Sequence, residues 1–253
     1  MAAPPEIDVD SDPRVTGEYV RQISDDDWTV TLVGTVHDHP ASVYRVRHVI
    51  ERVDPGILAL ELPPISLPLF EQYAATDQTP PALGGEMSAA IQAADSSPVV
   101  GIDRPTGDFF RRLAGVLLRE RPPLETVRTV VSNTAETTSH ALVCLAAAAV
   151  NACSSACLEV DSPTPHDAAR TDAPTDQAIH EREQVERCRS FTNAFRSANR
   201  SRATRLEDAA REAAMAARLV DLQEDGDGDI VAVVGIDHID ALAAELDASG
   251  ELN

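Results

Sequence analysis

Short apolar runs separated by structure breakers mark the first hundred residues and return near the end of the chain. Four of them, at 28–36, 57–62, 98–103 and 229–234, have the length of a strand and end at Gly, Pro or charged residues. After the first run, Ser42 is a residue type that caps helices, and a stripe at helical spacing follows: Val43, Val46, Val49, Ile50 and Val53. This β-α-β unit predicts parallel strands joined by a right-handed crossover.

The rest of the pattern is mainly helical. It predicts short helices at 66–75, 87–94, 109–119 and 239–246, and long helical stretches at 124–158, in two pieces, and at 176–222. We therefore expect an α/β fold with a mostly parallel central sheet flanked by helices, and a long helical segment before the last strand. The expected organisation is a disordered acidic leader at 1–26, one domain at 27–247 with a surface loop at 162–176, and a tail at 248–253.

The chain is strongly acidic. It has 42 Asp and Glu against 21 basic residues, all of them Arg, and a formal net charge of −21. This charge excludes a general binder of phosphate backbones, so no nucleic-acid partner is expected. A solubility bias in a GC-rich genome would explain the excess of acidic residues. Adaptation to the salt-rich cytoplasm of a halophile explains both the missing Lys and the acidic loops. We favour the halophile, because molar salt shortens the Debye length to roughly 3 Å and carboxylates then repel weakly.

Nothing in the sequence predicts export or membrane insertion. Residues 1–13 lack the basic and apolar regions of a secretory signal, and the best candidate for a membrane span, at 141–158, is mostly Ala. We interpret the Ala-rich stretch 141–152 as a tightly packed core helix. The four cysteines are interpreted as small buried hydrophobes: Cys144, Cys153, Cys157 and Cys188. A cytoplasmic protein without a membrane span is expected.

Two predicted strands run directly into the same pattern, Gly34-Thr-Val-His37 and Gly235-Ile-Asp-His238. Glu61 follows the second strand along the chain and Asp103-Arg104 the third, so ionisable residues end every strand, where parallel sheets bind ligands and glycine permits a sharp turn. Imidazole with carboxylate suits a divalent metal that activates water, and equally suits metal-free acid–base catalysis. The structural alternatives are loop histidines, a helix-capping carboxylate and a plain ion pair.

Four segments in this order resemble the TraB/PrgY family: Gly34-Thr-Val-His37, Gly84-Gly-Glu-Met-Ser-Ala-Ala-Ile-Gln-Ala-Ala94, Val100-Gly-Ile-Asp-Arg104 and Val233-Val-Gly-Ile-Asp-His238. The resemblance extends over 28–119 and 205–246, and the family is related to the Tiki metalloproteases and to EreA/ChaN-like proteins. It implies an α/β fold with a metal-dependent peptidase site and a divalent cofactor such as Mn, Co or Zn. Transferred to this chain, it implies three kinds of site residue: His37, His238 and Glu86 as metal ligands, Glu61, Glu86 and Arg104 as catalytic residues, and Arg112 and Arg211 as substrate-binding residues.

Two functions therefore remain open from the sequence. The first is a metal-dependent, peptidase-like hydrolase that acts on a peptide or a small molecule. The second is a non-catalytic protein that binds or sequesters a peptide or small ligand in the same cleft. Convergence of His37, His238, Glu61 and Glu86 in space would favour the enzyme. An oligomer is compatible with the sequence, and the arginines between 187 and 205 are interpreted as a solvated helix face.

Overall fold

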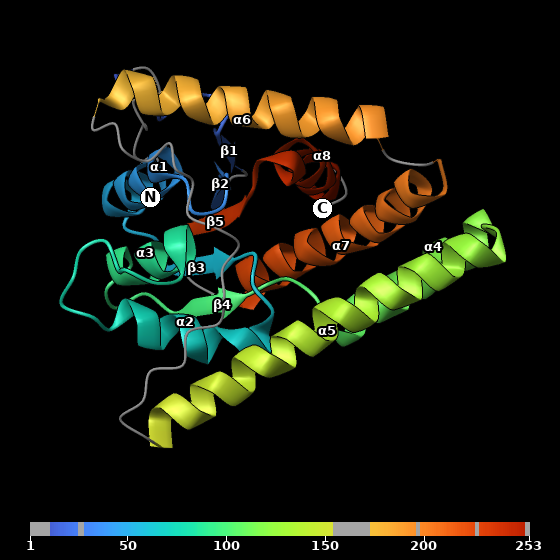
Figure 1. Cartoon of the computed structure of the whole chain (residues 1–253). Coiled ribbons are helices and arrows are strands. Elements are labelled where there is room, and N and C mark those ends of the chain that lie inside the picture. Colours follow the sequence, from blue (N-terminus) through green and yellow to red (C-terminus); the bar gives the residue numbers. More distant parts are fainter. Residues whose placement is uncertain (1–10, 25–27, 154–172, 196–197, 226–227, 251–253) are drawn as a thin grey trace.

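The computed structural model describes residues 11–24, 28–153, 173–195, 198–225 and 228–250. At its centre lies a five-stranded sheet in the order β1-β2-β5-β3-β4 (Figure 1). The strands β2 (Thr29–Thr35), β5 (Ile230–Gly235), β3 (Ile57–Leu60) and β4 (Val99–Gly101) are parallel, and β1 (Val20–Ser24) pairs antiparallel with β2 at one edge. The expected α/β fold with a mostly parallel sheet is confirmed.

Helices cover both faces of the sheet. On one face α1 (Pro40–Val53) and α3 (Gly85–Ala93) bury Val46, Val49 and Met87 against strand residues. On the other face α7 (Ala198–Asp225) and α8 (Ile239–Gly250) bury Leu219 and Leu242 in the same way. Burying one such side chain contributes about 1.5–3 kcal/mol. The strands β3, β4 and β5 contain only apolar residues and glycine because both faces of the sheet are covered.

The remaining helices form an outer layer. The 3-10 turn η1 (Pro64–Ser66) leads into α2 (Leu67–Ala74), and α4 (Gly107–Glu120) packs against α7. The long helix α5 (Leu124–Cys153) packs against α2 and α7 and runs along the outside of the molecule, while α6 (Pro174–Phe195) lies beside α1 (Figure 1). A second 3-10 turn, η3 (Ile236–His238), joins β5 to α8. Within the described residues, no helix combines the length and the hydropathy that crossing a bilayer requires.

Several expectations about element boundaries were wrong. Residues 20–24 of the expected disordered leader form β1, because Val20 and Ile23 are buried beside β2. The stretch predicted as two pieces is the single helix α5, and the one predicted as a single long segment is divided into α6 and α7. Residues 174–176 begin α6, and residues 248–250 complete α8. Residues 11–19 of the expected leader are also described, and Val15 and Tyr19 among them are buried. The other parts of the leader, loop and tail, at 1–10, 25–26, 162–172 and 251–253, lie outside the described residues.

The cysteines are also less buried than expected. Cys144 is buried, but Cys153 and Cys188 are exposed. The Ala-rich stretch 141–152 is a core helix along only one side, since Ala147 and Ala148 are buried while Ala146 and Ala149 are exposed. Cys157 lies outside the described residues. Helical spacing shows which residues share a side of a helix, but it does not show whether anything covers that side.

Candidate functional site

The strand order brings the two glycine-histidine patterns and Glu61 to one place. β5 lies between β2 and β3, with Gly235 opposite Thr35 and Val233 opposite Leu60. The residues that follow these three strands, His37, Glu61 and His238, therefore line one pocket of about 400 Å³. This is the position where open parallel sheets bind ligands, because the carboxyl ends of their strands meet at the same edge.

Gly34 serves close packing, and neither of the two glycines before the histidines makes a sharp turn. Gly235 has an ordinary extended backbone, with φ −61° and ψ 141°. A Cβ atom on Gly34 would lie 2.2 Å from Cδ1 of Ile239, which begins α8. The close approach of α8 to β2 explains Gly34, whereas a Cβ on Gly235 would make only ordinary contacts, the nearest at 3.5 Å from Oε2 of Glu61. The expectation of a glycine turn was wrong at both positions.

His37 is held by a buried carboxylate from α3. Its Nδ1 lies 2.6 Å from Oε1 of Glu86, whose other oxygen accepts a hydrogen bond from the backbone N–H of Asp38 at 2.9 Å. The side chain of Glu86 is 2% exposed, whereas that of His37 is 67% exposed. The hydrogen bond to Glu86 outweighs desolvation and raises the pKa of His37 to about 9, so the imidazolium form is favoured at neutral pH.

A glycine pair places Glu86 at this point. Gly84 and Gly85 have φ angles of 77° and 52° and start α3 from the left-handed region. A Cβ on Gly85 would also lie 2.1 Å from Oδ1 of Asp38. Glycine is thus needed at residue 85 both for its backbone conformation and for the space beside the His37 loop.

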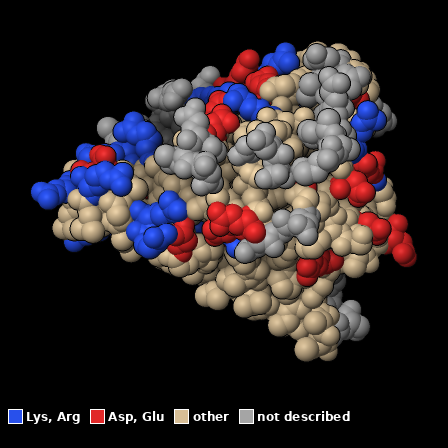
Figure 2. All heavy atoms as spheres, turned by 180° about the vertical axis from the view of Figure 1, so that it is seen from behind, with Lys and Arg blue, Asp and Glu red and all other residues tan. Residues whose placement is uncertain are grey.

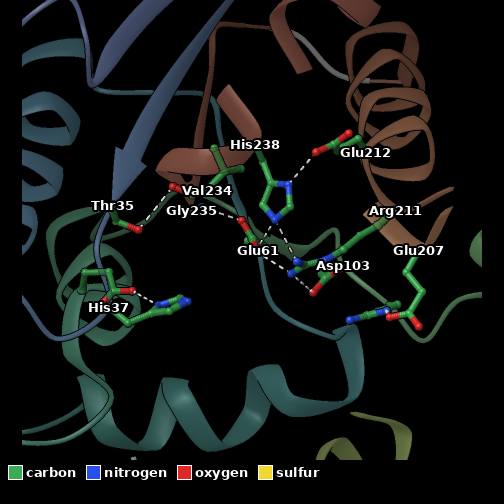
Figure 3. A network of polar contacts seen from close by, with 12 residues as sticks. Thr35, His37, Glu61, Asp103, Glu207, Arg211, Glu212, Val234, Gly235 and His238 are labelled. Carbon is green, nitrogen blue, oxygen red and sulfur yellow. Dashed lines mark hydrogen bonds and ion pairs between the residues drawn. The ribbon is translucent and has the colours of Figure 1, made fainter. Parts of the chain in front are cut away.

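Arg211 of α7 lies at the centre of the polar contacts (Figure 3). Its Nη2 donates to Glu61 and to Asp103, each at 2.5 Å, and its Nε donates to the second oxygen of Asp103 at 2.6 Å. The other oxygen of Glu61 accepts the backbone N–H of Gly235 at 2.5 Å. Burial raises the pKa of the Glu61 carboxyl, but the charges of Arg211 and His238 and the Gly235 hydrogen bond outweigh it and lower this pKa overall. Glu61 is therefore held ionised.

His238 lies between Arg211 and a second carboxylate. Nη1 of Arg211 is 2.9 Å from Nε2 of His238, and Nδ1 of His238 is 2.8 Å from Oε1 of Glu212. A guanidinium can only donate, so this contact needs a lone pair on Nε2 and places the proton on Nδ1, which donates to Glu212. Burial and the charge of Arg211 lower the pKa of His238, while Glu212 and Glu61 raise it more strongly, so its pKa lies above the ordinary value. Protonation would break the Arg211 contact, so the observed geometry belongs to the neutral imidazole.

The other predicted site residues lie elsewhere. Arg104 pairs with Glu207 of α7 at 3.3 Å, and Arg112 pairs with Asp108 along α4 at 2.5 Å. Neither is among the residues that line the pocket in the described part of the chain. Arg211 does line it, but it contacts the protein's own carboxylates.

Sequence reasoning missed two features of the site. Gln184, Val185 and Cys188 of α6 form one wall of the pocket, and Glu212 orients His238. All four lie on highly charged helices, in which functional and solvated polar residues have the same pattern. The only signal for Glu212 was its position directly after Arg211.

The arrangement does not fit a divalent metal at this point. Arg211 already contacts Nε2 of His238, Glu61 and Asp103, which are the donors that a metal ion would use. A metal there would face a permanent positive charge. In the described part of the chain, no group of three or more His, Cys, Asp or Glu side chains is arranged to hold a metal ion.

No protein-family model, no curated protein and no solved structure matches this chain. The similarity to the TraB/PrgY family consequently rests on the four segments of the sequence named above. The functional interpretation is argued from the geometry of the pocket.

Proposed function

We propose that the protein is a hydrolase, acting on a peptide or a small-molecule substrate in the pocket at the carboxyl edge of the sheet. One observation carries this proposal. The loops after two adjacent parallel strands each place a histidine in the same pocket, and each histidine is held through Nδ1 by a carboxylate, Glu86 for His37 and Glu212 for His238. A carboxylate on Nδ1 fixes the ring and its tautomer and directs Nε2 to the reaction.

Both histidines have raised pKa values, and the contact with Arg211 is what distinguishes His238 from His37. His238 is neutral in its contact with Arg211, so its Nε2 can act as general base once a substrate-bound water replaces Nη1 of Arg211. His37 has its pKa raised to about 9 and can donate a proton to the leaving group. Two groups in opposite protonation states at one pH provide the base and the acid of a hydrolysis. Glu61 and Arg211 form a fixed ion pair beside them.

The test is hydrolysis of fluorogenic peptide and ester substrates in 2 M KCl. We expect His37→Gln and His238→Gln each to lower kcat/KM by about 10²–10⁴-fold, the usual contribution of one general acid or base. His140→Gln is the matched control, because His140 is exposed on α5 and does not line the pocket. Turnover that neither pocket substitution changes would refute the assignment. Binding without turnover in the unmodified protein would favour the non-catalytic alternative.

Glu212→Gln tests the positioning of His238 separately. It keeps the shape of the side chain and removes the charge that raises the pKa of His238. We expect kcat to fall, and the acid limb of the pH–rate profile to move to lower pH, because the base then stays neutral at lower pH. A residue with a merely structural role would leave the position of this limb unchanged.

A metal-dependent peptidase, as the resemblance implies, is the second candidate. Carboxylate–histidine pairs are also the usual support of metal-bound imidazoles. Like the metal-free reaction, this version requires Arg211 to leave Nε2 of His238, and it also places a cation beside the guanidinium. Activity that EDTA abolishes and Mn, Co or Zn restores, with bound metal lost in His238→Gln, would establish it. Activity that is unchanged in EDTA would support the metal-free reaction.

A further inference from the structure

The most apolar surface of the described chain lies on α5. Nine large hydrophobic side chains are exposed in the described residues, and six of them are on this helix: Leu124, Val131, Leu142, Val143, Leu145 and Val150. The opposite side of α5 packs on the protein through Val130, Ala141 and Cys144. The exposed side is therefore a second, separate face of the same helix.

The exposed side of α5 presents a stripe of mostly small residues between large apolar ones. Spacings of three and four alternate without interruption along one stripe, in which every residue is exposed: Ser132, Ala135, Ser139, Leu142, Ala146, Ala149 and Cys153. Large apolar residues flank this stripe on both sides: Val131, Val143, Leu145 and Val150. A helix face of this kind can pack lengthwise against another helix, because small residues in the stripe let two backbones approach closely and the flanking apolar side chains are then buried.

Charge distinguishes this face from the rest of the surface. Residues 137–153 contain no Asp, Glu or Arg, in a chain of which 25% is charged and whose net charge is −21. Figure 2 shows the lower end of the molecule, toward which α5 runs, as a mostly uncharged surface. Two copies of so acidic a chain repel each other over most of their surfaces. An uncharged, apolar helix face is where they can meet.

We propose that the α5 face binds a second copy of this chain, so that the protein forms a dimer with two antiparallel α5 helices at its centre. The stripe from Val131 to Cys153 is about 35 Å long at 1.5 Å per residue and about 10 Å wide, which gives about 350 Å² on each copy and about 700 Å² in total. This is below the area of about 1,000 Å² that stable interfaces bury, and it belongs to the range of weak, transient interfaces. The dimer therefore dissociates in the micromolar range, and high salt, which screens the acidic surfaces, strengthens it.

The helix dipole sets the direction of the pair. The exposed charges near the start of α5 balance one another, because Arg119, Arg121 and Arg128 lie among the exposed Glu120, Glu125 and Glu136. An antiparallel pair places the positive end of each helix dipole beside the negative end of the other, whereas a parallel pair brings like ends together.

Sedimentation velocity in 2 M KCl, over 1–100 µM protein, tests the dimer. We expect the dimer fraction to rise with protein concentration. We expect Leu142→Glu or Ala146→Glu to weaken the dimer at least tenfold. The helical circular dichroism signal should stay unchanged, since both sites are exposed and Glu favours helix. Ile179→Glu is the matched control, because Ile179 is 50% exposed on α6 and should leave the dimer intact.

Three results would overturn the proposal. They are a monomer at every concentration, a dimer that Leu142→Glu leaves unchanged, and a monomer that binds anionic vesicles through this face and loses binding in Leu142→Glu.

Oxidative cross-linking tests the direction of the helix pair. Val143→Cys, near the expected two-fold axis, should cross-link above the background of the native cysteines, and Glu125→Cys should not. The reverse result would indicate a parallel pair.

Discussion

A buried ion pair holds α6 against the body of the protein. Arg45 of α1 and Glu181 of α6 are in direct contact, and both side chains are 0% exposed. Glu181 also accepts a hydrogen bond from Ser42 at 2.6 Å. Roughly one and two turns further along α6, Gln184 and Cys188 line the pocket. The stability of this ion pair therefore bears directly on the shape of the pocket.

The substitution Glu181→Gln preserves the size of the side chain but leaves the guanidinium of Arg45 buried without a counter-charge. Removing one partner of a buried pair costs about 3–5 kcal/mol, a large part of the 5–15 kcal/mol that stabilises a typical domain. We expect that loss in urea unfolding monitored by circular dichroism in 2 M KCl. The loss should change little between 1 and 3 M KCl, because water and ions do not reach the pair.

Two further variants make this reasoning refutable. Glu51→Gln breaks the exposed pair Arg47–Glu51 on α1, in which Glu51 is 58% exposed, and should cost less than about 0.5 kcal/mol. The double variant Arg45→Met with Glu181→Leu removes both charges and should recover most of the lost stability. A cost below about 1 kcal/mol for Glu181→Gln, or a double variant no more stable than the single one, would show that an unpaired buried charge is not the cause.

Two other predictions concern the loop around His37. Glu86→Gln removes the carboxylate that raises the pKa of His37 to about 9, so its NMR titration midpoint should fall toward the ordinary 6.5; an unchanged midpoint would exclude this cause. Since the folded-state pKa is raised, the stability from this pair is fully present below about pH 6.5 and is lost as the pH rises through about 9. The thermal unfolding midpoints of the native protein and of Glu86→Gln should therefore converge over that pH range. Gly85→Ala should lower the free energy of unfolding by about 1–3 kcal/mol, because φ is 52° and the new Cβ would lie 2.1 Å from Oδ1 of Asp38. Its control, Gly115→Ala at an open position in α4, should raise that free energy by up to about 1 kcal/mol in the same assay, and equal effects at the two sites would contradict this account.

The site shows where sequence reasoning reached its limit. His37, Glu61 and His238 could be singled out because each follows an apolar strand, and the ends of parallel strands meet. Arg211 and Arg104 could not be told apart in their roles by pattern, yet the first lies among the carboxylates of the pocket and the second pairs with Glu207 outside it. In a chain with 42 acidic residues, the sequence also does not distinguish Glu212 from the many carboxylates that are expected to face solvent.

By itself, the sequence determined four of the five strands, most of the helices and the parallel direction of the main strands, because the spacing of apolar residues records which side of each element avoids water. Only the tertiary structure decided that β5 lies between β2 and β3, that α6 forms a wall of the pocket, that Arg211 occupies its centre and that one side of α5 is left bare. These features depend on which element lies beside which. Periodicity within one segment carries no information about its neighbour, so long-range packing alone decides them.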